Sequence, residues 1–235
     1  MNPIYHQLDF GITCIDTEHM RKDFVAAYLI EDEGRAAFVD TGCYLSVPTL
    51  LATLEAKNIQ RENVDYILLT HIHLDHAGGA GELIKHLPNA KVYVHEYGAN
   101  HLIDPSKLRA GVIGVYGELF FKQFLGDLIP TPKEKVVIAK DGDTITLGNR
   151  TLKFIDTPGH ARHHVCIWDE KSQGLFSGDT LGVSYREFDT NQGELVFPPT
   201  TPVQFDPEVW KDTIKNLMSL KPMSPNSYIN NQRHF

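Results

Sequence analysis

The stretch LLTHIHLDHAGG (residues 68–79) places three histidines and an aspartate directly after an apolar run. His71 and His73 are two residues apart, and on an extended segment such residues face the same side, so both imidazoles can reach one metal ion. Asp75 and His76 follow where the chain turns into a helix, and they can point at a second position nearby. Any one of these histidines alone would be interpreted as a surface or core residue. The pattern H-x-H-x-D-H predicts a metal site, because neutral imidazole suits zinc and a carboxylate neutralises its charge.

Two other segments carry side chains that can complete such a site. DTPGHARHH places His160 on a turn after a strand, and LFSGDT places Asp179 just past a strand end. An aspartate at that point can direct one carboxylate oxygen at each of two metal ions. Asp40 ends the strand-like FVDTG, where it is either a turn-capping carboxylate or a residue that fixes the loops around the metal without binding it.

The strand signals fall into two groups, each followed by helices. Strands are predicted at residues 24–30, 35–40, 64–70 and 91–95, and again at 135–139, 143–147, 151–157, 163–169 and 174–179. Helices are predicted at residues 46–57, 75–86 and 206–220. This order fits two packed sheets with helices outside them better than an alternating parallel α/β fold.

Residues 98–132 interrupt the strand pattern with apolar and aromatic residues near helical spacing. They form either a plain core helix or a lid whose aromatic side chains wall a substrate pocket. Glycines at positions 111, 114 and 117 weaken the helix and would permit movement. We treat this segment as a helical insertion in a single domain that covers residues 1–235.

Composition excludes several classes of partner. The chain has 235 residues with 42% hydrophobic content, which allows one large core, and its net charge of −8 disfavours nucleic acid. The longest apolar runs are too short to span a membrane, and MNPIYHQLDF lacks the features of a signal peptide. Cys14, Cys43 and Cys166 are too few and too scattered for a disulfide framework. We therefore expect a cytoplasmic protein with free thiols that acts on a small molecule; a homodimer is left open.

Taken together and in this order, VDTG, THIHLDH, TPGH and SGDT resemble the motifs of the metallo-β-lactamase superfamily. The resemblance covers the chain from about Gly11 to about Pro222. These motifs are specific for fold and metal binding, and they say little about the substrate. The resemblance implies an α+β fold, a four-layer αββα sandwich with the metals in a cleft at one edge.

The resemblance also implies which residue binds which ion. By that analogy the first metal takes three histidines, the second takes an aspartate and a histidine, and a further aspartate bridges both: His71, His73 and His160; Asp75 and His76; and Asp179. It further implies one more histidine on the second metal, late in the chain and after an apolar strand. The polar segment MSPNSYINNQRHF lacks that strand, and His234 is the remaining candidate. Either His234 is the ligand, or the C-terminus is truncated or altered and a single metal ion binds.

The expected activity is that of a zinc-dependent hydrolase, mononuclear or dinuclear, in which a metal-bound hydroxide attacks a small ester, thioester or lactone. Asp75 or Asp179 would orient the hydroxide and pass its proton to the leaving group. Hydroxyacylglutathione hydrolases and lactonases are the nearer analogies in the superfamily. Iron or manganese can replace zinc on these ligands, so the alternative is an iron-dependent oxidoreductase that resembles persulfide dioxygenases.

Three further residues are candidate substrate contacts. Tyr185 and Arg186 lie in SYREFD, shortly after Asp179, and could bind a substrate carbonyl or carboxylate, although a salt-bridged loop explains them equally well. His163 and His164 follow the His160 turn. Each of them either faces the cleft or serves in packing.

Overall fold

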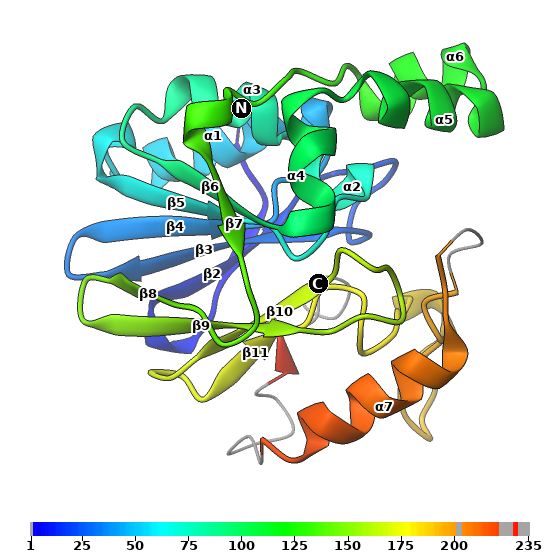
Figure 1. Cartoon of the computed structure of the whole chain (residues 1–235). Helices are drawn as coiled ribbons and strands as arrows, with labels where there is room; N and C mark the ends of the chain where they lie inside the picture. The colour runs from blue at the N-terminus through cyan, green and yellow to red at the C-terminus, as the bar shows by residue number, and fades with distance from the viewer. Residues whose placement is uncertain (1, 201–203, 221–227, 230–235) are drawn as a thin grey trace.

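The computed structural model describes residues 2–200, 204–220 and 228–229, and in this part of the chain two β-sheets pack face to face with helices on their outer sides (Figure 1). Helices α1, α3 and α4 cover the outer face of one sheet, and α7 covers the other. The predicted α+β sandwich of four layers is therefore confirmed.

In the described residues the larger sheet has seven strands in sequence order, from β1 to β7. The strands β1 to β4 pair antiparallel, and β4 to β7 pair parallel. Their bounds are β1 Tyr5–Gln7, β2 Ile12–Asp16, β3 Ala26–Asp32, β4 Arg35–Val39, β5 Val64–Leu68, β6 Lys91–His95 and β7 Val136–Ala139.

The smaller sheet has the described order β12-β11-β10-β9-β8. Its strands are β8 Thr144–Leu147, β9 Arg150–Asp156, β10 Val165–Asp169, β11 Gly174–Phe176 and β12 Tyr228–Ile229. The expectation that the C-terminal segment contains no strand was wrong for these last two residues, because β12 pairs parallel with β11. Backbone pairing with a strand edge needs no apolar run, which explains why hydrophobic pattern alone missed it.

The helices differ in length and in how closely they pack on the sheets. Their bounds are α1 Val47–Ala56, α2 Leu74–Ala77, α3 Ala80–Leu83, α4 Glu96–Ile103, α5 Ser106–Tyr116, α6 Glu118–Phe120 and α7 Pro207–Met218. Short 3₁₀ segments are η1 Asp9–Gly11, η2 Tyr44–Ser46, η3 Arg61–Asn63, η4 Ile84–His86, η6 Lys133–Lys135 and η7 Arg186–Phe188, and η5 Phe121–Leu125 is a π-helical turn. Residues 98–132 are thus largely helical, and α5 and α6 project from the body of the molecule (Figure 1).

Two buried clusters hold the layers together. Alternate residues of β3 enter different clusters: Tyr28 and Ile30 pack between the sheets with Phe154, whereas Leu29 packs with Leu50 under α1. A strand that is buried on both faces reads as continuously apolar, as AAYLI does. These clusters position the strand ends from which the polar loops leave.

The predicted helix at residues 75–86 is broken into α2, α3 and η4. The break falls at Gly78 and Gly79, where the backbone packs directly against the backbone of Gly42 and Cys43. A Cβ on Gly79 would lie 2.9 Å from the carbonyl oxygen of Cys43. The Gly79 N–H donates to the Gly42 carbonyl at 3.0 Å. A continuous helix would not allow this close packing, so tertiary contact overrides the local preference.

Candidate metal centre

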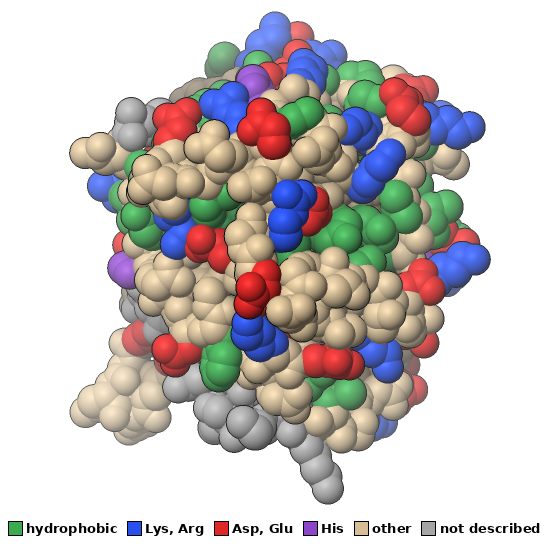
Figure 2. Space-filling model, turned by 90° about the vertical axis from the view of Figure 1, so that its left-hand side faces the viewer, with side chains coloured by type: hydrophobic (Ala, Val, Ile, Leu, Met, Phe, Trp, Pro, Cys, Tyr) green, Lys and Arg blue, Asp and Glu red, His purple; other side chains and the backbone are tan. Residues whose placement is uncertain are grey.

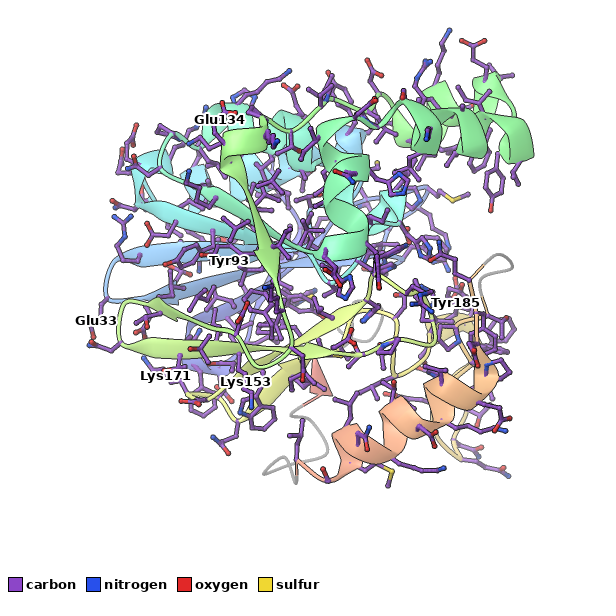
Figure 3. The ribbon with its side chains drawn as sticks, in the orientation of Figure 1. Glu33, Tyr93, Glu134, Lys153, Lys171 and Tyr185 are labelled. Carbon is purple, nitrogen blue, oxygen red and sulfur yellow. The ribbon has the colours of Figure 1, made fainter. Side chains whose placement is uncertain are left out.

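Loops from both sheets meet at one end of the molecule. β4 and β5 are parallel neighbours, so the loops that carry Asp40 and the histidine cluster leave the same edge. β9 and β11 both run antiparallel to β10, so the loops that carry His160 and Asp179 also leave a common edge. In Figure 3 Tyr185 marks this end, and Glu33 and Lys171 mark the opposite one. Figure 2 shows that opposite end, with acidic and basic side chains interspersed over it.

Four side chains converge on a first position: His71, His73, His160 and Asp179, whose ligand atoms all lie within 4.8 Å of one another. The Nδ1 atom of His73 lies 2.9 Å from Nε2 of His71 and 3.0 Å from Nε2 of His160. Oδ2 of Asp179 lies 3.5 Å from Nε2 of His160 and 3.9 Å from Nε2 of His71. Ligand atoms around a tetrahedral zinc ion are about 3.3 Å apart, so this set of three nitrogens and one oxygen fits a metal.

A second position lies beside the first, on the other oxygen of Asp179. Oδ1 of Asp179 is 3.2 Å from Nε2 of His76, and Oδ2 of Asp75 is 3.4 Å from the same nitrogen. Asp179 therefore presents one oxygen to each position. The structure thus brings together all six residues that the sequence singled out as ligands in the described part of the chain.

Asp40 holds the histidine loop from behind. Its buried carboxylate accepts hydrogen bonds from the Thr70 N–H at 2.8 Å and from the Thr70 hydroxyl, and it lies 2.9 Å from Nδ1 of His76. The Thr70 hydroxyl in turn lies 3.1 Å from Nδ1 of His71. These contacts leave Nε2 of both histidines directed at the two positions, which is the arrangement that orients metal ligands. His160 is fixed in the same way, by donation from Nδ1 to the Pro199 carbonyl at 2.8 Å.

Burial and neighbouring charges set the protonation of the ligands. Burial, aided by neighbouring histidines, holds the pKa of His71 well below its ordinary value and lowers the pKa of His73 to about 4. Both are therefore neutral at pH 7, as metal binding requires. Burial alone would lower the pKa of His76, but Asp179 and Asp75 outweigh burial and raise it well above 6.5. The binding of a cation at the second position would replace that proton.

Of the two roles left open for His164, contact with substrate in the cleft and packing, its position agrees with packing. Its side chain is fully buried, and Nε2 accepts the N–H of Asp179 at 3.3 Å. Its Nδ1 lies 2.8 Å from the Thr157 hydroxyl and 3.0 Å from the Thr180 hydroxyl. The alternative of a substrate contact was wrong, because these partners occupy both nitrogens and burial removes the ring from the surface. His164 instead holds the backbone of Asp179, a role that sequence reasoning missed for it and for both threonines.

Tyr185 lies in an aromatic group next to the site. Its ring stacks on Phe24 at 5.5 Å and lies 6.2 Å from Phe197. Burial and the nearby charge of Asp179 raise its pKa, so the hydroxyl stays protonated. The backbone of Arg186 belongs to η7, and its side chain lies outside the described residues, as does His234.

The fold and this ligand set together define a metal-binding protein of the αββα class. The chain belongs to the metallo-beta-lactamase superfamily, whose family model matches residues 20–223. It is 31% identical over 164 residues to the metallo-beta-lactamase fold-containing protein ST1585 of Sulfurisphaera tokodaii, covering 68% of this chain and 58% of that protein. It is also 31% identical over 171 residues to a hydroxyacylglutathione hydrolase of Francisella tularensis subsp. novicida, covering 70% of this chain and 53% of the relative. The chain thus spans a little over half the length of these curated relatives.

Solved structures agree on the fold. The crystal structure of ST1585 from Sulfolobus tokodaii matches with a TM-score of 0.68 and 26% identity, over 89% of this chain and 74% of that one. MEM-A1, a subclass B3 metallo-beta-lactamase from a soil metagenome library, matches with a TM-score of 0.65 over 99% of this chain and 80% of its own. Its identity of 21% supports the fold alone. Within the described residues, no helix is long and apolar enough to cross a membrane.

Proposed function

We propose that the protein is a metal-dependent hydrolase of small esters, thioesters or lactones. The observation that carries this proposal is the convergence of four imidazole nitrogens and two carboxylates on two adjacent positions, with Asp179 between them. The relatives named hydroxyacylglutathione hydrolase support hydrolysis, and their name suggests the acyl thioester class as the first to test.

We propose zinc as the metal, one ion at each position, with iron or manganese as the alternatives that the same nitrogen and oxygen ligands accept. When bound, such an ion lowers the pKa of a coordinated water to about 7 and so supplies hydroxide at neutral pH. The first position would be held by His71, His73 and His160, and the second by Asp75 and His76. Asp179 would contribute one oxygen to each.

Asp75 is suited to handle the proton. Its side chain is 31% exposed, compared with 11% for Asp179, so it is the carboxylate that solvent and substrate reach. Burial alone would raise its pKa, but His76 outweighs burial and keeps it low, so Asp75 is ionised at neutral pH and can accept a proton from water. It can then return that proton to a leaving oxygen or sulfur.

Tyr185 is the proposed contact for the substrate carbonyl, because its protonated hydroxyl can donate a hydrogen bond beside Asp179. The three free cysteines are buried, which agrees with the cytoplasmic location that we infer. We also propose that the substrate is a small molecule. If copies of the chain associate, the proposed assembly is a homodimer.

The test combines metal quantification of the purified protein with a screen of esters, thioesters and lactones. We expect stoichiometric zinc and hydrolysis of at least one class, with Asp179→Ala lowering kcat about 100-fold or more. His86→Ala is the control, since His86 contacts Glu82 on the surface and should change neither quantity. Stoichiometric iron with oxygen uptake would instead assign the protein to the oxidoreductase alternative, and normal turnover of Asp179→Ala would remove that residue from the reaction.

A further inference from the structure

The first metal position combines histidines that come from two different sheets. His71 and His73 follow β5 of the larger sheet, whereas His160 lies on the loop between β9 and β10 of the smaller sheet. We propose that His163, on the same loop as His160, is a positioning residue that holds the segment from His71 to His73 in place. This inference rests on the metal centre of the proposed function, and it concerns how the ligands are aligned rather than which residues bind the ion.

The segment after β5 has left the sheet, so its backbone groups need partners from elsewhere. The Thr70 N–H donates to the buried carboxylate of Asp40 at 2.8 Å. Two residues further on, the N–H of the buried Ile72 donates to Nδ1 of His163 at 3.4 Å. His163 therefore serves Ile72 as Asp40 serves Thr70, and it does so at the residue that separates two metal ligands.

A second contact joins the same two segments. The Val165 N–H donates to the Thr70 carbonyl at 2.8 Å, and the partners of this bond lie two residues from the partners of the His163 bond on each segment. One hydrogen bond alone would set a distance, but two bonds side by side also set the orientation of one segment relative to the other. The pair therefore aligns the loop that carries His160 with the segment that carries the other two histidines.

The imidazole ring of His163 also packs beside two ligand rings. Its centroid lies 6.2 Å from that of His71, with an angle of 9° between the planes, and 5.5 Å from that of His73, with an angle of 90°. The residue is 5% exposed. A substitution that tests the hydrogen bond must therefore keep the bulk of the side chain, so that packing against the ligands is retained.

The hydrogen bond determines the tautomer of His163. A backbone N–H can only donate, so Nδ1 must be the unprotonated nitrogen and the proton lies on Nε2. Burial, with the neighbouring His73 and His160 adding to it, lowers the pKa of His163 to about 3, so the ring is neutral at pH 7. The Oδ1 atom of asparagine stands the same number of bonds from the backbone as Nδ1 of histidine, so asparagine can accept the same N–H.

The experiment compares His163→Leu with His163→Asn in the full chain. Leucine fills the space but cannot accept a hydrogen bond, and asparagine is smaller but can. We expect zinc affinity, measured by competition with a chelator, to fall about 10–100-fold in His163→Leu and to stay close to the wild-type value in His163→Asn. The visible spectrum of bound Co²⁺, which reports ligand geometry, should change in the leucine variant alone.

His86→Leu is the control, because His86 contacts Glu82 away from the metal centre and should leave affinity and spectrum unchanged. Circular dichroism of each metal-free variant establishes that it is folded. A further readout needs neither metal nor a leucine variant. Proton–nitrogen correlation spectra of the metal-free wild type give the tautomer of each histidine, and the His163 signals are those missing from His163→Asn. We expect the proton on Nε2.

Four results would overturn the proposal: wild-type zinc affinity with an unchanged Co²⁺ spectrum in His163→Leu, an asparagine variant that loses as much affinity as the leucine variant, a proton on Nδ1 of His163, or a wild type that binds no ion. Failure of the hydrolase proposal is separable, because it concerns turnover. A protein whose metal affinity depends on His163 and that hydrolyses no ester, thioester or lactone would keep this inference and lose that function.

Discussion

Asp40 shows how one buried side chain organises the metal centre. Asp40 is completely buried, and its backbone is left-handed with φ of 59°. Its carboxylate contacts Thr70 and His76. The carboxylate thereby fixes the orientation of one ligand directly and of His71 through the Thr70 hydroxyl. A ligand that is held in place before the metal arrives loses less conformational freedom on binding, which raises affinity.

Thr70→Val should weaken metal binding without removing any ligand. The valine side chain has the shape of threonine but neither donates to Asp40 nor accepts from His71, while the backbone N–H still donates to Asp40, so we expect zinc affinity to fall about 10–100-fold. The free energy of unfolding should fall by about 1–3 kcal/mol. Competition titration against a chelator measures the affinity. Thr53→Val is the matched control, because Thr53 is equally buried but bonds to Thr49 in α1. Equal zinc affinities for both variants would contradict the positioning role.

At the scale of elements, α7 clamps the two loops that come from the smaller sheet. Trp210 Nε1 donates to the Thr180 carbonyl at 2.7 Å, next to Asp179. The Thr213 hydroxyl donates to the Pro158 carbonyl at 2.7 Å, next to the His160 turn. Asp206 caps the helix by accepting the N–H groups of Glu208 and Val209. The helix therefore sets the spacing between ligands that lie on different loops.

Gly159→Ala should disturb this clamp. Gly159 has φ of 127°, and a Cβ there would lie 2.4 Å from the Cα atom of Trp210, so either α7 or the His160 turn must move. We expect a loss of stability of more than about 1 kcal/mol and weaker zinc binding. Gly111→Ala is the control, because its Cβ meets open space within α5 and should stabilise the helix by about 1 kcal/mol. Urea unfolding and zinc titration of the pair test this, and wild-type behaviour of Gly159→Ala would refute the close packing.

An ion pair joins the two sheets at the far end. Asp32, in β3, accepts the Asn149 N–H at 2.8 Å and pairs with Lys171. Burial alone would raise the pKa of Asp32, but the bonds from Lys171 and Asn149 outweigh burial and lower it. Because the pKa of Asp32 is lower in the folded chain than its value of about 3.9 in the unfolded chain, the ionised carboxylate stabilises the folded state at pH values above about 3.9. This contribution is lost as pH falls through the folded pKa.

Lys171→Met should therefore destabilise the protein in a pH-dependent manner. Lys171 is half exposed, so the loss near pH 7 should be at most about 1 kcal/mol. The difference from the wild type should begin to shrink as pH falls below about 4, the unfolded pKa, and should vanish once pH has fallen through the lower folded pKa of Asp32. Urea unfolding of metal-free protein across this range measures it. Lys215→Met is the control, since its exposed pair with Asp212 should contribute nothing measurable. A difference that is constant with pH would contradict the assignment.

At the scale of the whole molecule, the ligands are divided between the two sheets. His71, His73, Asp75 and His76 follow the larger sheet, whereas His160 and Asp179 follow the smaller one. A bound ion would therefore link the two halves of the sandwich. Because the unfolded chain cannot present these groups together, metal binding should favour the folded state.

Zinc should raise the unfolding temperature markedly. At a free zinc concentration 1,000 times Kd, linkage adds about 4 kcal/mol, which corresponds to an increase of about 10 °C for a chain of this size. Differential scanning calorimetry with zinc and with chelator measures the shift. His73→Ala should abolish it, because His73 contacts both other histidines of the first position. A zinc-dependent shift that persists in His73→Ala would remove that residue from the ligand set.

The sequence by itself determined the layered α+β fold and four of the residues that converge, because strand pattern and the spacing of H-x-H-x-D-H are local properties that survive without coordinates. His160 and Asp179 were candidates from their places after strand ends, and the resemblance of the motifs to the superfamily joined them to the other four. The sequence could not reveal that Thr70 and His164 hold residues of the site, since each is an isolated residue whose role depends on what lies across the fold. Only the tertiary structure decided that the predicted helix breaks at Gly78 and Gly79 and that His164 is buried. Both follow from packing between distant segments, which no local pattern encodes.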